Sequence, residues 1–264
     1  HRLLRAHYQD AGLPENFQVL DSDDQLRLVK RVMRELQIDE GRWPPRQAQW
    51  FINSHKDEGL RAGHIQENPG DHFTSTMLQI YRQYEKLCNQ GGLVDFGELL
   101  LRSHELWLHR PELLAHYQRR FQHILVDEFQ DTNTIQYAWL QILASNRVPL
   151  TVVGDDDQSI YGWRGAKIEN IQQYQRDFPN SRLVRLEQNY RSTQLILKAA
   201  NAVIANNQGR LGKELWTDGP DGEPISLYAA FNEMDEANYI ADTIGAWVDE
   251  GNLRIEAAIL YRSN

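Results

Sequence analysis

The sequence feature that most constrains the fold is the stretch Ile-Leu-Val-Asp-Glu-Phe-Gln-Asp at residues 124–131. Three apolar residues, two of them β-branched, lead directly into the adjacent carboxylates Asp127 and Glu128. A short continuous apolar run is typical of a buried parallel strand, and ligands of open α/β sheets bind beyond the carboxyl ends of the strands. The stretch therefore predicts a strand that delivers two carboxylates to a nucleotide site. A strand that ends in a solvated acidic turn is the alternative.

The pattern of elements predicts an α/β fold. After residue 121 strands alternate with helices, which favours right-handed βαβ units and a parallel sheet. Strands are expected at residues 124–126, 150–153, 182–186, 225–229 and 257–261, and the last two helices at 192–204 and 235–248. The segment 1–121 has only helical apolar spacing, with a capping box at Ser22 and Gln25 and a further N-cap at Asp95. We therefore expect an all-α region followed by a parallel sheet.

The second strand ends in Gly154 and the polar run 155–158. Because the carboxyl ends of parallel strands meet at one edge of a sheet, Gln158 is expected near Asp127 and Glu128. A glutamine there could hydrogen-bond a γ-phosphate oxygen or the attacking water while the carboxylates carry the charge. A polar acidic turn without a ligand is the alternative.

The loop that follows carries Tyr161, Trp163 and Arg164 among glycines. Aromatic side chains beside arginine on a loop suit the stacking of unpaired bases, which contributes about 1–3 kcal/mol per base without sequence preference. This loop could therefore join a phosphate contact at its start to a nucleic-acid contact at its end. A tryptophan buried in the core is the alternative.

The third predicted strand runs into Glu-Gln-Asn-Tyr-Arg-Ser at residues 187–192. Arg191 could reach a phosphate as a transition-state stabiliser, and Tyr190 could stack on a base such as adenine. A helix-capping turn with a surface arginine is the alternative.

Charge and cysteine content restrict the class of protein. The net charge of -9 argues against a surface that grips DNA everywhere, but it leaves room for a local basic groove. The single Cys88 excludes an internal disulfide and fits a cytoplasmic protein. No apolar run reaches the roughly 18–20 residues that span a bilayer, so no membrane contact is expected. No histidine lies at zinc spacing with Cys88.

Taken together, the motifs resemble those of the superfamily 1 helicases of the UvrD/Rep/PcrA type. Residues 126–131 resemble their Walker B motif, residues 154–166 their third motif and residues 186–192 their fourth. Residues 93–96 and 258–264 also match family patterns. The likeness covers essentially the whole chain.

The resemblance implies a fold and a division into three regions. Residues 1–121 would be an all-α inserted subdomain, of the type called 1B. Residues 122–187 would be the second part of a first RecA-like P-loop domain (1A), and residues 188–264 the start of a second one (2A).

The resemblance also implies an ATP-dependent 3′–5′ DNA helicase that acts in DNA repair, with ATP and Mg²⁺ as cofactors. Asp127 would coordinate Mg²⁺ and Glu128 would activate the hydrolytic water. Gln158 would sense the γ-phosphate, Arg191 would be an arginine finger, and Tyr190 would stack on adenine.

The implied partners are single-stranded DNA, junctions of single and double strands, and DNA-repair proteins. Trp163, with Tyr161 and Arg164, would contact the single strand. Two other readings stay open, namely a helicase–nuclease subunit of the AddA/RecB type and an enzymatically inert nucleic-acid- or protein-binding module.

One family motif is absent from the sequence. No Gly-x-x-x-x-Gly-Lys-Ser/Thr occurs, and the segment 209–214 only imitates it, with short spacing and no Ser or Thr after Lys213. We therefore expect the sequence to be a central portion of a longer helicase. Alone, it is expected neither to hydrolyse ATP measurably nor to unwind DNA.

Overall fold

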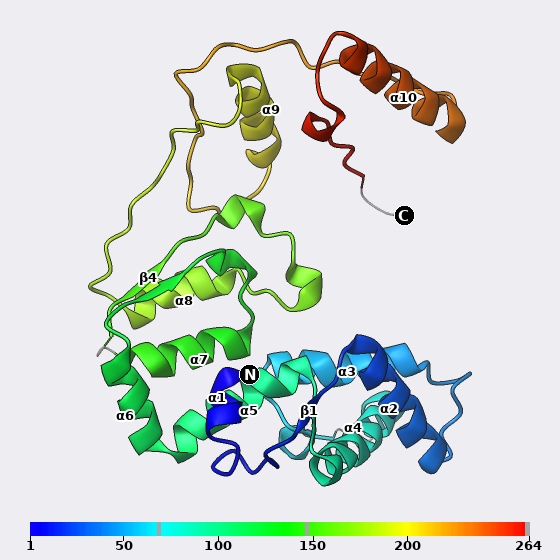
Figure 1. Cartoon of the computed structure of the whole chain (residues 1–264), viewed down its shortest axis with the longest axis vertical. Helices are drawn as coiled ribbons and strands as arrows, with labels where there is room; N and C mark the ends of the chain where they lie inside the picture. The colour runs from blue at the N-terminus through cyan, green and yellow to red at the C-terminus, as the bar shows by residue number, and fades with distance from the viewer. Residues whose placement is uncertain (68–69, 146–147, 262–264) are drawn as a thin grey trace. The chain divides into compact units, whose positions relative to one another are not determined.

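The computed structural model describes residues 1–67, 70–145 and 148–261. They form two compact units, His1–Val184 and Arg185–Asn264, which are described separately. The helices of the first unit are α1 Arg2–Ala6, α2 Ser22–Glu35, α3 Pro45–Asp57, α4 His72–Gly91, α5 Phe96–His109, α6 Pro111–Arg120, α7 Thr134–Ala144 and α8 Glu169–Asp177 (Figure 1). No described helix combines the length and the apolar character needed to cross a membrane.

The predicted parallel pairing of the first two strands is confirmed. β3 (Ile124–Val126) pairs in parallel with β4 (Leu150–Val152), with Val126 opposite Val152. Helix α7 connects the two strands, and α8 follows β4, where the Tyr174 hydroxyl donates to the Leu150 carbonyl at 2.9 Å. The small parallel sheet and the surrounding helices place the unit in the α/β class.

The expectation of an all-α region at residues 1–121 is wrong in one respect. β1 (Gln18–Val19) pairs in parallel with β2 (Leu93–Val94). Each strand has only two residues, too few for the alternation by which a strand is recognised in a sequence. The pair is formed by two segments far apart in the chain, so only the packed structure brings them together.

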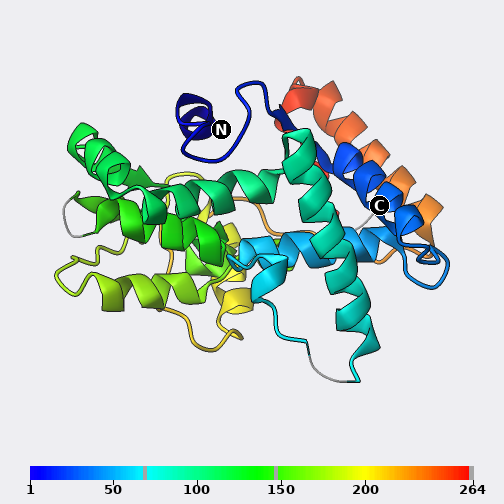
Figure 2. The ribbon, with the colours of Figure 1, turned by 90° about the horizontal axis from the view of Figure 1, so that it is seen from below.

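The core of the helical region lies between α2, α3 and α4, which are seen side by side in Figures 1 and 2. Val29, Met33, Ile52 and Tyr81 are fully buried there. Helix α4 ends where Gly92 adopts a left-handed conformation, with φ 60°, and its N–H donates to the Cys88 carbonyl.

Two N-cap predictions had different outcomes. The Asp95 cap of α5 is confirmed, because its carboxylate accepts the Glu98 N–H at 2.7 Å. The capping box at Ser22 and Gln25 is wrong. Asp21 caps α2 instead by accepting the Asp24 N–H, and Gln25 is buried. Asp and Ser are comparable N-caps, so sequence alone could not select between neighbours.

The second unit contains α9 (Gln194–Ile204) and α10 (Glu233–Asp249), both close to their predicted positions. Its described residues show only one β-bridge, between Gln188 and Trp216, and no strand. The strands expected at 225–229 and 257–261 are therefore wrong, and so is the one expected at 182–186, which spans the boundary between the units. A strand needs a hydrogen-bonded neighbour, and these described segments have none; residues 262–264 of the last motif lie outside the described part.

Candidate nucleotide and DNA site

The carboxylates Asp127 and Glu128 directly follow β3, and both are exposed. Glu128 has a left-handed backbone, with φ 50° and ψ 44°, which is uncommon for a residue other than glycine and concentrates at functional sites. The Asp127 carboxylate accepts the Glu128 N–H at 2.9 Å. This turn presents the two side chains beyond the end of the strand, as the sequence predicted.

The ends of β3 and β4 are joined by backbone hydrogen bonds. Val153 N–H donates to the Val126 carbonyl at 2.7 Å, and Phe129 N–H donates to the Val153 carbonyl at 2.9 Å. Gln130, only 1% exposed, adds a side-chain link between the two turns. Its Nε2 donates to Glu128 Oε2 at 2.7 Å, and its Oε1 accepts the Asp155 N–H at 3.0 Å. The structure therefore brings the Walker B-like turn to the start of the third motif.

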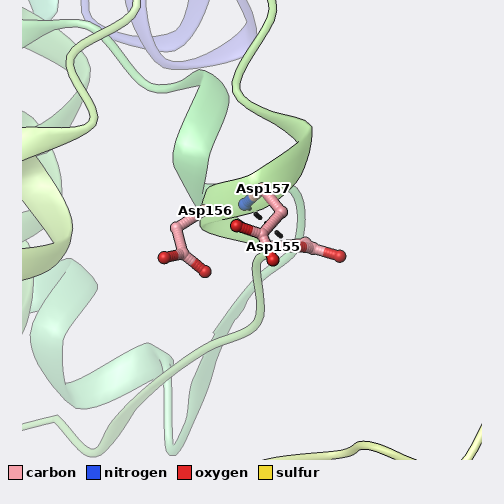
Figure 3. Close-up of side chains that lie close together, drawn as sticks. All are labelled: Asp155, Asp156 and Asp157. Carbon is pink, nitrogen blue, oxygen red and sulfur yellow. Dashed lines mark hydrogen bonds between the residues drawn. The ribbon is translucent and has the colours of Figure 1, made fainter. Parts of the chain in front are cut away.

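The turn after β4 gathers three carboxylates, Asp155, Asp156 and Asp157, whose oxygens lie within 4.8 Å of one another (Figure 3). Asp155 accepts the Asp157 N–H at 3.0 Å and the Gln158 Nε2 at 2.7 Å. Gln158 is thus held by Asp155 within its own turn. All three are half-buried, and acidic groups gathered near a protein surface are common without an ion, so we assign them no metal.

The aromatic loop after this turn is arranged around Arg164. Its guanidinium lies 4.8 Å from the ring centroid of Tyr161 and 4.5 Å from that of Trp163. Trp163 is 70% exposed, so the alternative of a core tryptophan is wrong. An open indole face beside a cation suits the stacking of a base near a phosphate.

Sequence reasoning missed the residues that fix this loop. Lys167 N–H donates to the Thr132 carbonyl at 2.9 Å. The buried Asn170 Nδ2 donates to the Thr132 carbonyl and hydroxyl at 3.0 and 3.1 Å. Thr132 and Asn133 follow the Walker B-like turn, so the far end of the loop is tied to the same segment as its start. Isolated Thr and Asn residues carry no pattern that would have marked them.

The end of α3 also contacts this region. Asp57 Oδ1 accepts Asn133 Nδ2 at 2.8 Å, while Glu58 accepts the Thr134 hydroxyl at 2.8 Å and pairs with Lys167 Nζ at 2.9 Å. Burial of Asp57, reinforced by the negative charge of Glu58, raises the pKa of the Asp57 carboxyl to about 6. At neutral pH the ionised Asp57 carboxylate therefore lowers the stability of the folded protein relative to the unfolded chain.

Replacing Asp57 with asparagine is expected to stabilise the protein at pH 7. The folded pKa lies above the unfolded value of 3.8. The contribution of the protonated Asp57 carboxyl to the free energy of unfolding is therefore fully present below about pH 4 and is lost as the pH rises through about 6. The asparagine side chain still accepts a hydrogen bond and carries no charge. Urea titrations should show a gain of about 1 kcal/mol at pH 7, allowing for solvent screening of a half-buried group, and no gain at pH 4. An equal gain at both values would contradict this cause.

Tyr190 and Arg191 belong to the other unit and precede α9. Asn189 Oδ1 accepts the backbone N–H groups of Arg191 and Ser192 at 2.9 and 2.8 Å, which forms a tight turn. Tyr190 is 86% exposed, and its hydroxyl donates to Gln188 Oε1 at 2.7 Å. The Arg191 side chain is exposed as well. Both side chains can therefore reach a ligand outside the unit.

A buried charge cluster in the helical region was not predicted either. Lys56, 1% exposed, lies 2.7 Å from Asp95 Oδ2 and 3.0 Å from Glu98 Oε2. Burial opposes the charge of Lys56, but Asp95 and Glu98 outweigh it and raise the pKa of the ammonium group. Arg61 pairs with Glu98 and with two further glutamates, Glu85 and Glu105. Since each charge has a partner, the cluster is structural.

Comparison with known proteins finds helicase relatives along the whole length of the chain. The profile of the UvrD/REP helicase N-terminal domain matches residues 1–179, and that of the UvrD-like helicase C-terminal domain matches residues 184–264. The chain is 62% identical to DNA helicase II of Escherichia coli and 56% identical to that of Haemophilus influenzae, over all 264 residues. It is 40% identical over the same length to the ATP-dependent DNA helicase PcrA of Bacillus subtilis. It spans 36% of each of these relatives.

Proposed function

Because the chain belongs to the UvrD/REP helicase family, we propose that it works within an ATP-dependent DNA helicase that moves 3′ to 5′ along single-stranded DNA and unwinds duplexes in DNA repair. The observation that carries this proposal is the junction of the two turns after β3 and β4. It joins the carboxylates suited to nucleotide chemistry to a loop that carries the exposed aromatic side chain of Trp163. We place this activity in the cytoplasm, with single-stranded DNA, strand junctions and repair proteins as partners.

The proposed fold is a pair of RecA-like domains with a helical insertion. Residues 1–121 form the insertion, residues 122–187 complete the first RecA-like domain, and residues 188–264 begin the second. The parallel β3–β4 pair with its carboxylates at the strand ends supports the assignment of the first domain. The assignment of the second rests on its motif and on the family relationship.

The proposed nucleotide site uses oxygen ligands and an activating base. Asp127 is an exposed carboxylate at a strand end, the kind of ligand that Mg²⁺ prefers, so it fits as the metal ligand. Bound Mg²⁺ would neutralise charge on the β- and γ-phosphate oxygens of ATP. Glu128 would accept the proton of the attacking water. Gln158 would hydrogen-bond the γ-phosphate after leaving Asp155.

Two residues before α9 are also proposed to act on a nucleotide. Tyr190 would stack on adenine, and Arg191 would stabilise charge on the transferred phosphoryl group. Their exposure supports these roles, since neither side chain is buried in its own unit.

Replacing Glu128 with glutamine tests the enzymatic proposal. In a protein that carries this chain together with a P-loop, the DNA-stimulated ATPase rate is expected to fall by about 10²–10⁴-fold, because the general base is lost. Glu112→Gln, an exposed glutamate on α6, is the control and should leave the rate unchanged. The isolated 264 residues, which contain no P-loop, should show no turnover. A Glu128→Gln protein with full activity would favour the inert binding module.

Trp163→Ala should weaken the affinity for single-stranded DNA, because its exposed ring would lose a stacked base worth about 1–3 kcal/mol. This corresponds to roughly 5- to 150-fold in Kd. The affinity for ATP should hardly change. Fluorescence anisotropy with a labelled oligonucleotide measures the effect, and Trp163→Phe should retain most of the affinity since it keeps a stacking ring. Equal DNA affinities for all three proteins would refute the assignment.

A further inference from the structure

Gln130 occupies an unusual place, buried between the turn that bears Glu128 and the turn that bears Gln158. We propose that Gln130 is a positioning residue that couples the catalytic carboxylate to the third motif, an inference that rests on the proposed function. The pair of hydrogen bonds from Glu128 Oε2 through the Gln130 amide to the Asp155 N–H is called here the Gln130 bridge.

The chemistry of the partners fixes the orientation of the Gln130 amide. An ionised carboxylate only accepts hydrogen bonds, so the amide nitrogen must face Glu128. A backbone N–H only donates, so the amide oxygen must face Asp155. If the amide were flipped, its oxygen would face the Glu128 carboxylate and its nitrogen would face the Asp155 N–H. Because Gln130 is 1% exposed, water cannot replace a lost partner without cost, which is about 1–3 kcal/mol for an unsatisfied buried polar group.

The main chain approaches the bridge closely at Gly154. A Cβ atom on Gly154 would lie 2.8 Å from Gln130 Oε1 and 3.2 Å from the Phe129 backbone nitrogen. Glycine at residue 154 is therefore favoured by the close approach of the Gln130 oxygen and of the Phe129 backbone. The bridge and the strand-end hydrogen bonds form one tightly packed junction.

The bridge continues to the side chain that is proposed to sense the γ-phosphate. Gln158 Nε2 donates to Asp155 Oδ2, and Asp155 is the residue whose backbone N–H binds Gln130. A nucleotide that draws Gln158 away from Asp155 would release this turn and alter the support of Glu128. The same turn leads into the loop of Trp163, so movement at either end reaches the carboxylate. Such mutual influence of two sites is a coupling free energy and acts in both directions.

If the Gln130 bridge acts as proposed, two substitutions of Gln130 should both lower kcat but differ in their effect on hydrogen exchange of the Asp155 amide. A glutamine that only fills space would produce no such difference. Gln130→Glu keeps the shape and the acceptor for the Asp155 N–H. When it is assayed at alkaline pH, so that neither carboxyl holds a proton, it replaces the donor to Glu128 by a second negative charge. Gln130→Met keeps the approximate volume and removes both hydrogen bonds. The first variant breaks only the catalytic half of the bridge, whereas the second breaks both halves.

The experiment uses the protein that carries this chain together with a P-loop. We expect kcat of the DNA-stimulated ATPase to fall about 10- to 100-fold in both variants, as is usual for residues that orient a reacting group. KM for ATP and the affinity for single-stranded DNA without nucleotide should stay within about two-fold, which is well below a tenfold (1.4 kcal/mol) effect. Without nucleotide, hydrogen exchange of the Asp155 amide should accelerate in Gln130→Met only.

The matched control is Gln118→Met, which removes a buried glutamine that donates to the Ile142 carbonyl at 3.2 Å, outside the bridge. It should leave kcat and Asp155 exchange unchanged. If Gln130→Met does not fold, Gln130→Glu decides alone. A kcat for Gln130→Glu equal to that of the control would overturn the coupling. The Glu128→Gln variant separates failure of the coupling from failure of the proposed function. If the Glu128→Gln protein keeps full ATPase activity, Glu128 is not the general base and the proposed function itself fails.

Discussion

Replacing Arg191 with alanine is expected to lower kcat for ATP hydrolysis by roughly 10³–10⁵-fold, the largest loss we foresee for one side chain. An arginine finger acts on charge that develops in the transition state, so KM for ATP should change far less than kcat. The turn made by Asn189 Oδ1 holds the Arg191 backbone while its side chain stays exposed. Steady-state kinetics at saturating DNA, on a protein that carries this chain together with a P-loop, measures the effect.

Arg185→Ala is the matched control for this prediction. Arg185 is an exposed arginine of the same unit whose Nη2 donates to the Leu211 carbonyl, and its loss should leave kcat unchanged. Arg191→Lys should recover only part of the rate, since an ammonium cannot reproduce the planar fork of a guanidinium. If Arg191→Ala and Arg185→Ala have the same kcat, Arg191 is a surface residue of a capping turn.

Asp95→Ala should cost the His1–Val184 unit about 3–5 kcal/mol of unfolding free energy, because it leaves the buried Lys56 without its nearest counter-charge. The Asp95 carboxylate accepts hydrogen bonds from Lys56 Nζ, the Tyr84 hydroxyl and the Glu98 N–H, each at 2.7 Å. After the substitution Glu98 alone faces the ammonium group, at 3.0 Å. Urea unfolding of the 264-residue chain, followed by tryptophan fluorescence, measures the loss.

Two further variants identify the cause of this loss. Asp95→Asn keeps the size and, through Oδ1, the helix cap. It removes the charge and places an amide donor where Oδ2 accepts from Lys56 and Tyr84, so it should account for most of the effect if the ion pair and its hydrogen bonds are responsible. Glu35→Ala breaks the exposed pair of Glu35 with Arg31 and should hardly move the urea midpoint. Equal midpoints for Asp95→Ala and Glu35→Ala would show that the buried pair adds no stability.

Local signals predicted the parts of the structure that depend on neighbouring residues. The apolar run before Asp127 and Glu128 predicted β3 and the place where both carboxylates emerge. The helices of the second unit were foreseen near their true bounds, and Asp95 was recognised as an N-cap. Each of these features follows from the preferences of a few consecutive residues, which is the range over which sequence patterns are informative.

Features that need a distant partner could not be predicted. The strands expected at 182–186, 225–229 and 257–261 have suitable residues, but the described chain offers them no hydrogen-bonded neighbour. Conversely, β1 and β2 form because packing brings two unremarkable dipeptides together. The burial of Lys56 beside Asp95 depends on the meeting of α3 and α5 in the same way.

The sequence by itself determined the chemical groups at the strand ends, the aromatic and arginine residues of the loop at 161–164 and the family to which these motifs belong. Only the tertiary structure decided which of those groups are linked and how they are held. Gln130 illustrates the difference. In the sequence it is one polar residue of a motif, whereas in the folded protein its buried amide joins Glu128 to Asp155. Hydrogen bonds between turns depend on the register of β3 against β4, and that register is a property of the packed pair rather than of either strand.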